Sequence, residues 1–209
     1  MDVISRIEDD INKIKVIRFE EEKIDSDSYF VKLESGKYYL NNDRMLVRET
    51  VIKNSGSGNA SCVFAVTKDK KIVLVLLPRV ALPVSHKINL EIPAGYVENG
   101  EDSVKAAMRE LTEETGYVAS SMVKVDEYYP GLGISGERVD LYLAFDCEYQ
   151  GLEHFDEDEV IICETVTFEE FEMLLNRGYL KGINARLGYY HYLDYMRKDD
   201  YEKGKEKKV

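Results

Sequence analysis

The chain has 209 residues, of which 44% are hydrophobic and 33% charged, and its formal net charge is −12. That length and composition are ordinary for a globular protein with one substantial core, and no run approaches the roughly 18 apolar residues that a membrane span needs. The negative charge disfavours non-specific binding to nucleic acid, because such binding depends on neutralising phosphates with Lys and Arg.

The first 57 residues are predicted to form a small β-rich subdomain. Residues 3 to 14 predict a short helix, and the segment 1 to 15 lacks the continuous apolar stretch of a signal peptide, so we expect a cytoplasmic protein. Short alternating runs predict strands at 29 to 33, 38 to 40 and 45 to 53. The sequence Asn-Ser-Gly-Ser-Gly-Asn at 54 to 59 then predicts a flexible boundary.

A second domain is expected from residue 58 to 197. Its first element is a predicted β-hairpin, with apolar runs at 61 to 67 and 72 to 77 on either side of a charged turn. A short strand at 90 to 92 follows. The Pro-Ala-Gly sequence at 93 to 95 is expected to end that strand, because proline cannot donate to the ladder and glycine allows a tight turn.

A helix is predicted next, with Asp102 or Ser103 as its N-cap and Gly116 as its C-terminal stop. Apolar and small residues recur along it at offsets of 3, 4, 7 and 11, which places them on one face. They are Val104, Ala107, Met108, Leu111 and Thr115. We expect this face to pack on a sheet.

Three carboxylates gather on another arc of the same predicted helix. Glu110 lies three and four residues before Glu113 and Glu114, so the three side chains crowd together and repel one another. A solvated acidic face is the simplest interpretation of three such glutamates in an acidic chain. A divalent cation explains the crowding better, since Mg²⁺ and Mn²⁺ prefer carboxylate oxygens.

Strands are predicted again after this helix, at 122 to 129 and 139 to 145, on either side of a glycine-rich loop at 130 to 138. A further strand is predicted at 161 to 166. Thr167 and Glu170 then have the spacing of a capping box, which predicts a helix ending near Gly178.

A last helix is predicted at 183 to 196, where four tyrosines are expected to pack on the sheet. The tail at 198 to 209 is so rich in Lys, Asp and Glu that we expect it to be disordered. The chain's cysteines, Cys62, Cys147 and Cys163, lack metal-ligand spacing and are expected to be core thiols. Its three histidines are scattered, which leaves carboxylates as the available chemistry.

The segment from Gly95 to Tyr117 resembles the Nudix box at every position. The glycine of the box is Gly95, and Glu101 follows after five intervening residues. After seven more intervening residues come Arg109 and Glu110, then Glu113 and Glu114, and Gly116 stands near the end of the box. The resemblance implies an α/β/α sandwich with a mixed sheet. It also implies hydrolysis of a nucleoside diphosphate linked to another moiety, with Mg²⁺ or Mn²⁺.

The same resemblance implies roles for the residues of the box. Glu110, Glu113 and Glu114 would be metal ligands. Arg109 would orient them by ion pairing and Glu101 would support the geometry of the loop and helix. Bound metal would neutralise the diphosphate and lower the pKa of the attacking water.

Sequences outside the box are similar to the ADP-ribose pyrophosphatase branch of the family, over about residues 44 to 192. They are Glu91-Ile-Pro-Ala-Gly95, Tyr129-Pro130-Gly131 and Asp156-Glu-Asp-Glu159. This likeness implies that the Ala94 carbonyl is a metal ligand, that Glu159 lies near the metals and that Glu157 is the base. The choice between Glu157 and Glu159 as the base stays open.

The branch also implies substrate contacts from Arg79 and Glu137, with Gly95 and Pro130 beside the substrate. The chain departs from the branch at two of these places. Leu77-Pro78-Arg79 stands where Gln-Tyr-Arg is usual, and Ser135-Gly136-Glu137 stands where a Ser-Glu pair is usual.

The expected reaction is cleavage of ADP-ribose, or of a related nucleoside diphosphate sugar, to AMP and a sugar phosphate. Alternatives are another nucleoside diphosphate derivative, such as a dinucleoside polyphosphate or NADH, and a non-catalytic nucleotide-binding regulator. The regulator is disfavoured because the box glutamates are all present and residues 1 to 57 show no basic recognition helix. The resemblance further implies a homodimer in which the N-terminal strands help to build the partner's substrate site.

Overall fold

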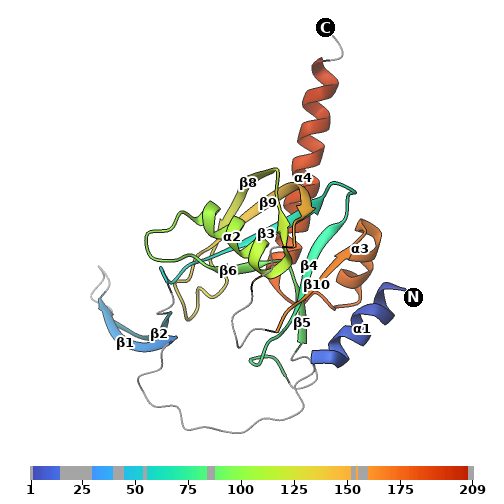
Figure 1. Ribbon diagram of the computed structural model, residues 1–209. Coiled ribbons are helices and arrows are strands. Elements are labelled where there is room, and N and C mark those ends of the chain that lie inside the picture. Colours follow the sequence, from blue (N-terminus) through green and yellow to red (C-terminus); the bar gives the residue numbers. More distant parts are fainter. Residues whose placement is uncertain are drawn as a thin grey trace.

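In the computed structural model, helices cover both faces of a central sheet, and a two-stranded hairpin stands apart at one side (Figure 1). The structure describes residues 2–14, 30–39, 45–53, 56–83, 88–151, 154 and 160–206. The helices are α1 (Val3–Ile14), α2 (Ser103–Thr115), α3 (Phe168–Asn176) and α4 (Ile183–Glu206). The strands are β1 (Val31–Tyr39), β2 (Met45–Lys53), β3 (Ala60–Thr67), β4 (Ile72–Pro78), β5 (Ile88–Glu91), β6 (Ala94–Tyr96), β7 (Tyr117–Val118), β8 (Ser121–Tyr128), β9 (Val139–Tyr149) and β10 (Ile162–Val166).

The central sheet is mixed, as the sequence predicts. Its main path runs β10-β4-β3-β9-β7, with β5 paired to β4, β6 to β3 and β8 to β9. β3 and β9 are parallel and the other pairs are antiparallel. β3 lies at the centre of this arrangement, which explains why nearly all of its side chains are buried.

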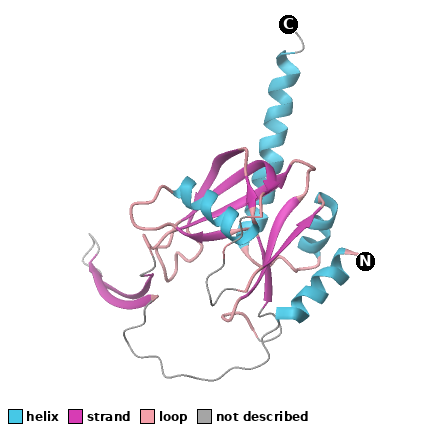
Figure 2. Cartoon of the chain, in the orientation of Figure 1, coloured by secondary structure: helices cyan, strands magenta, loops and turns pink. Residues whose placement is uncertain are grey.

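Alternation along β3 divides the core into two layers. Cys62, Phe64 and Val66 face a cluster shared with α1, α3 and α4, whereas Val63 and Ala65 face a cluster shared with α2. Figure 2 shows the resulting order of helix, sheet and helix. The α/β/α sandwich expected from the sequence is confirmed.

The first predicted helix is confirmed at its predicted bounds, as α1. Val3 and Ile7, one turn apart, are buried in the core of the sandwich beside β4. The helix therefore packs with the main domain, whereas the β1–β2 hairpin lies to one side of it in the described part of the chain. The predicted domain boundary near residue 57 stays a prediction.

The tight turn predicted at residues 93 to 95 is wrong. Ala94 and Gly95 belong to β6, where they pair with Cys62 and Ser61 of β3. β5 ends at Glu91, two residues before Pro93. The Pro93 carbonyl accepts a hydrogen bond from the Val63 amide of β3, 2.9 Å away, directly before β6 begins. Gly95 has no positive φ angle, so its role lies in what approaches its backbone.

The last helix is longer than the sequence predicts, because α4 continues past Met196 to Glu206. Lys and Glu favour helices, and charges four residues apart can pair, as Asp194 and Lys198 do at 2.7 Å. The composition that predicts disorder at 198 to 209 is therefore also suited to a projecting helix. No helix in the described ranges is long and apolar enough to cross a membrane.

The hairpin of β1 and β2 touches the main domain through the glycine-rich loop. The Val51 amide donates to the Ile134 carbonyl at 2.7 Å, and Val51 forms an isolated parallel bridge with Ser135. β1 and β2 pair throughout their length, from Val31 with Lys53 to Tyr39 with Met45. The predicted strands at 29 to 33 and 38 to 40 are thus one continuous strand in the described residues.

Candidate active site

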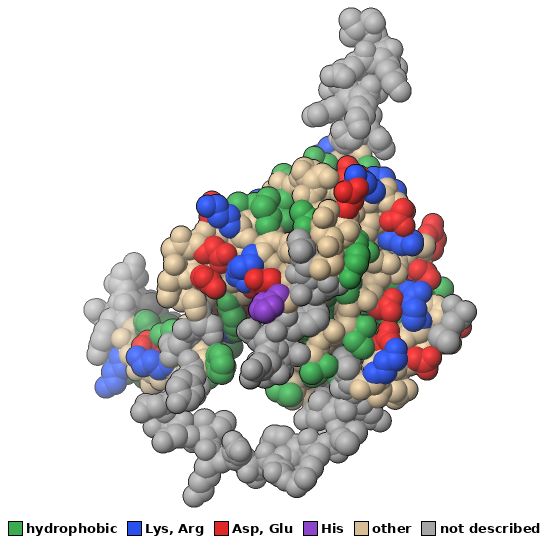
Figure 3. Space-filling model, in the orientation of Figure 1, with side chains coloured by type: hydrophobic (Ala, Val, Ile, Leu, Met, Phe, Trp, Pro, Cys, Tyr) green, Lys and Arg blue, Asp and Glu red, His purple; other side chains and the backbone are tan. Residues whose placement is uncertain are grey.

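A cavity of about 540 Å³ lies beside α2 and β6. Acidic and basic side chains gather on this face of the domain, over α2 (Figure 3). The lining residues come from the hairpin, the end of β4, β6, α2 and one point in the loop after β9. They are Phe30, Gly56, Leu77, Arg79, Ala94, Gly95, Tyr96, Glu98, Arg109, Glu110, Glu113, Glu114 and His154.

The capping residues at both ends of α2 set the bounds of the helix and so the positions of its glutamates. The Asp102 carboxylate accepts from the Val104 amide at 3.2 Å, and Gly116 ends the helix with φ 70°, a left-handed conformation that suits glycine. Ala107 and Leu111 are buried against the sheet as predicted. The predicted apolar face is wrong at Met108, which is 46% exposed, because the buried arc turns toward Ala106.

Arg109 joins three carboxylates of the site. Its Nη1 donates to Glu110 Oε1 at 2.8 Å and to Glu113 Oε2 at 2.9 Å, while Nε and Nη2 donate to Glu101 at 3.1 and 3.2 Å. Nη2 also donates to the Tyr96 carbonyl at 3.0 Å, which ties α2 to β6. This guanidinium offsets part of the repulsion among the glutamates.

These contacts shift the pKa values of both partners of the Arg109–Glu101 pair. The hydrogen bond from Arg109 holds the pKa of Glu101 below its usual value, and this effect outweighs burial. The hydrogen bond to Glu101 is also the main reason why the pKa of Arg109 is raised, with help from Glu110 and Glu113. Both groups are therefore charged at neutral pH.

Gly95 leaves open the space that the Glu110 carboxylate occupies. A Cβ atom at position 95 would stand 2.0 Å from the Glu110 carboxyl carbon, so any side chain there would displace this carboxylate. The glycine is thus needed for close approach between β6 and α2 rather than for a turn.

Glu114 is buried, which corrects its expected place on an exposed arc of the helix. It is 7% exposed, and its Oε2 accepts from the Ala94 amide at 3.0 Å. The reason is that the edge of β6 lies against this side of α2, a contact between segments that helical spacing alone does not reveal. Ala94 and Glu114 are thus in contact through the Ala94 amide, and the expected role of the Ala94 carbonyl as a metal ligand stays a prediction.

The donor set fits a divalent cation in its chemistry. Carboxylate and backbone carbonyl oxygens suit Mg²⁺ and Mn²⁺, and the gap over Gly95 accommodates the Glu110 carboxylate. Within the described ranges, no three Asp, Glu, His or Cys side chains already converge on a single metal-binding point. Arg109 engages Glu110 and Glu113 instead. Glu157 and Glu159, the other expected carboxylates, lie outside the described residues.

Arg79, the expected nucleotide contact, lines the same cavity. Its Nε and Nη2 donate to the two carboxylate oxygens of Glu91 at 2.7 and 2.9 Å. This bidentate pair raises the pKa of Arg79, in opposition to burial, which lowers it, so the guanidinium keeps its charge beside the cavity.

Two other expected substrate contacts do not line this cavity. Glu137 forms an ion pair with Lys53 in a neighbouring cavity of about 230 Å³, between the end of β2 and the glycine-rich loop. Lys53 in turn lies 5.2 Å from the centre of the Tyr96 ring. Pro130 is exposed after β8.

Two of the residues that line the cavity are not predicted as site residues by any pattern in the sequence. Phe30 comes from the start of the hairpin and is 69% exposed at the cavity. His154 is placed by a hydrogen bond from its amide to the Glu113 carbonyl, 3.0 Å away. Both reach the cavity through contacts between segments that are distant in the sequence.

Comparison with known proteins agrees with this geometry. Residues 57–185 match the family model described as NUDIX domain. The chain is 37% identical over 132 residues to "ADP-ribose pyrophosphatase" of Bacillus subtilis, a match that covers 63% of this chain and 68% of that protein. It is 34% identical over 157 residues to "Methanol dehydrogenase activator" of Bacillus methanolicus, with 73% and 81% covered.

A solved structure shares the fold. It is titled "Crystal structure of ADP compounds hydrolase", and it superimposes with a TM-score of 0.70 at 18% identity, covering 85% of this chain and 92% of that one. The arrangement of the sandwich is therefore common to both proteins.

Proposed function

The chain belongs to the Nudix family, and on this premise we propose that it cleaves the pyrophosphate bond of ADP-ribose, or of a related nucleoside diphosphate sugar. The products would be AMP, or the corresponding nucleotide, and a sugar phosphate. One observation carries the proposal: the α2 carboxylates and Arg79 line the same cavity. The similarity to the ADP-ribose pyrophosphatase of Bacillus subtilis supports the choice of substrate.

The α2 glutamates and the Ala94 carbonyl are the proposed metal ligands. Glu110 rests over Gly95, and Glu114 is held at the Ala94 amide, so both carboxylates have fixed positions before any ligand enters. Glu113 is the more exposed of the three and can reorient. A bound Mg²⁺ or Mn²⁺ would neutralise diphosphate charge and lower the pKa of a coordinated water.

Arg109 and Glu101 are proposed to position these ligands. Arg109 bonds to Glu110 and Glu113, and Glu101 holds its other edge. If a bound cation engaged the glutamate oxygens, the bonds of Arg109 to Glu101 and to the Tyr96 carbonyl would still anchor its side chain. The guanidinium thus keeps the acidic cluster together in both situations.

The base that takes the proton from the attacking water is proposed to be Glu157 or Glu159. Both lie outside the described residues, in the segment that follows β9. His154, three residues before Glu157 in the sequence, lines the cavity, and its amide donates to the Glu113 carbonyl of α2. Separate Glu157→Gln and Glu159→Gln variants would assign the base, because its loss lowers kcat and flattens the acidic limb of the pH profile.

We also propose that two copies of the chain associate through the hairpin. Directly paired residues share a face of an antiparallel ladder, and one face of this hairpin carries a row of exposed apolar side chains that the Ser35–Glu49 pair interrupts. They are Val31, Leu33, Met45 and Val47. A lone two-stranded hairpin is marginally stable in water, so a second copy of the chain would both cover this face and stabilise it.

A substrate panel tests the proposed reaction. ADP-ribose, nucleotide sugars, NADH and a dinucleoside polyphosphate would each be incubated with Mg²⁺ or Mn²⁺, and the products separated by chromatography. The proposal predicts that the highest kcat/KM belongs to ADP-ribose or another nucleoside diphosphate sugar. Preferred cleavage of NADH or a dinucleoside polyphosphate would show that the chain acts on another class of Nudix substrate. Tight binding of ADP-ribose without release of AMP would instead indicate a binding regulator.

A further inference from the structure

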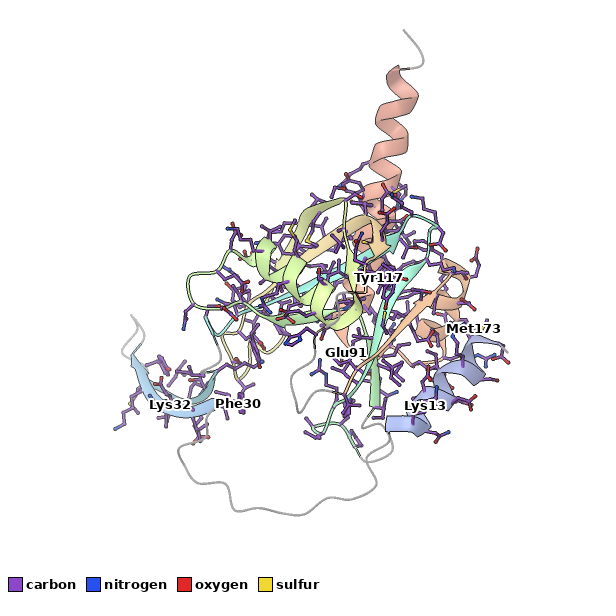
Figure 4. The ribbon with its side chains drawn as sticks, viewed as in Figure 1. Lys13, Phe30, Lys32, Glu91, Tyr117 and Met173 are labelled. Carbon is purple, nitrogen blue, oxygen red and sulfur yellow. The ribbon has the colours of Figure 1, made fainter. Side chains whose placement is uncertain are left out.

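Arg79 is held beside the cavity by two polar residues of β5. In the ladder between β4 and β5, Val75 pairs with Glu91 and Leu77 pairs with Asn89. Asn89 and Glu91 are two residues apart, so both side chains lie on the same face of β5. Arg79 follows the end of β4 and meets that face. Figure 4 labels Glu91 within the body of the domain, well away from Phe30 on the hairpin.

The three side chains form a continuous line of hydrogen bonds. Asn89 Nδ2 donates to Glu91 Oε1 at 2.9 Å, and the same oxygen accepts from Arg79 Nε at 2.7 Å. Glu91 Oε2 accepts from Arg79 Nη2 at 2.9 Å. These bonds use one edge of the guanidinium. Nη1 makes no hydrogen bond within the described part of the chain, and Arg79 lines the cavity.

Asn89 is an unusual residue for its position. It is 5% exposed, and its Oδ1 has no hydrogen-bond partner among the described residues. An apolar side chain would avoid the cost of burying that oxygen. The bond from Nδ2 to Glu91 is what the asparagine adds and an apolar residue could not supply.

We propose that Asn89 is a positioning residue for nucleotide binding: it fixes the Glu91 carboxylate, which holds the Arg79 guanidinium in place for the diphosphate of the substrate. The inference rests on the proposed function, because that function assigns the diphosphate to this cavity. A long arginine side chain loses much rotamer freedom when it binds a ligand, and prior fixation by Glu91 removes part of that loss. The other edge of the guanidinium, which carries Nη1, would then meet the phosphate oxygens in one orientation.

A double-mutant cycle on ADP binding tests the proposal. The dissociation constant of ADP would be measured by titration calorimetry with Mg²⁺ for wild type, Asn89→Leu, Arg79→Ala and the double variant. Asn89→Leu is expected to weaken ADP binding about 3- to 10-fold in the wild-type background, the effect of one hydrogen bond. In the Arg79→Ala background it should have no further effect, because the guanidinium it positions is gone.

Steady-state kinetics on ADP-ribose and a matched control give a second test. Asn89→Leu should raise KM by a similar factor and change kcat less than about two-fold, since the α2 carboxylates are untouched. Asn184→Leu is the control, because Asn184 accepts a hydrogen bond from Tyr128 and does not line the cavity. It should leave both ADP binding and KM unchanged. If Asn89→Leu does not fold, Asn89→Ser, too short to reach Glu91, replaces it.

The outcomes separate this inference from the proposed function. Equal losses of ADP binding from Asn89→Leu in both backgrounds, or no loss in either, would overturn the positioning role even if wild type hydrolyses ADP-ribose. Wild type that binds ADP but leaves ADP-ribose intact would contradict the proposed reaction, and the cycle would still decide the role of Asn89. Absence of ADP binding to wild type would overturn the positioning role, and product analysis of ADP-ribose would still decide the proposed reaction.

Discussion

The two groups of residues that line the cavity are built in different ways. The acidic group comes from one continuous segment, Gly95 to Gly116, and the ion pairs of Arg109 within it join residues at most eight positions apart. The second group, Arg79, Phe30 and His154, comes from three distant segments. The proposed metal chemistry is thus carried by one local segment, whereas the proposed substrate contacts depend on how the rest of the chain folds.

The largest expected effect is in the acidic group. Glu114→Gln should lower kcat on the order of 100-fold or more, because it removes a proposed metal ligand. Its amide oxygen can still accept from the Ala94 amide, so the Tm should change little. Glu169→Gln on α3 is a matched control with no role at the cavity. Wild-type turnover of Glu114→Gln at saturating Mg²⁺ would remove Glu114 from the metal site.

A second prediction concerns the close approach of β6 and α2. Gly95→Ala places a methyl group where the Glu110 carboxylate lies, so kcat should fall about 10- to 100-fold while the fold is retained. Gly133→Ala is the control, since nothing lies within 4 Å of a Cβ atom at that position. Kinetics and thermal melting of both variants would check this. A Gly95→Ala enzyme with normal kcat would mean that the position of Glu110 is unimportant for the reaction.

The third prediction concerns the second group of residues, through the hairpin that carries Phe30. Leu33→Lys places a charge in the apolar row and should weaken self-association tenfold or more, measured by light scattering over a dilution series. Lys32→Ala, on the other face of the same strand, should leave association unchanged. A wild-type chain that is an active monomer at micromolar concentration would show that the hairpin has another role.

The smallest expected effect is the pH dependence of stability from Glu101. Its pKa in the folded protein lies below the usual value of 4.5, because Arg109 donates hydrogen bonds to it. The folded-state pKa is depressed, so the stabilisation is fully present above the unfolded pKa and is lost as pH falls through the folded value. Glu101→Gln should therefore lower the Tm near neutral pH. The Tm of this variant should also fall less on acidification than the Tm of the wild type. An equal drop in both proteins would show that the pair does not contribute.

The features that the sequence predicts well depend on neighbouring residues. The ends of α2 follow from Asp102 and Gly116, whose capping interactions lie within one turn of the helix. The capping box of Thr167 and Glu170 is confirmed for the same reason. Continuous apolar runs likewise predict β3 and β4, because both strands are buried on both faces at the centre of the sheet.

The features that the sequence does not predict depend on contacts between segments. The burial of Glu114 requires the edge of β6, which a helical wheel does not contain. The bidentate contact between Arg79 and Glu91 requires the register of β4 with β5, which places Glu91 within reach of the guanidinium. The length of α4 is a different case, because charged residues at helical spacing suit both a disordered tail and a projecting helix.

Product analysis of ADP-ribose tests the central claim most directly. Purified wild-type chain would be incubated with ADP-ribose and Mg²⁺, and the products resolved by chromatography with and without a chelator. Equal amounts of AMP and ribose 5-phosphate are expected, formed only with the divalent cation and strongly reduced in Glu114→Gln. Release of ADP or adenine, or equal rates in wild type and Glu114→Gln, would contradict it.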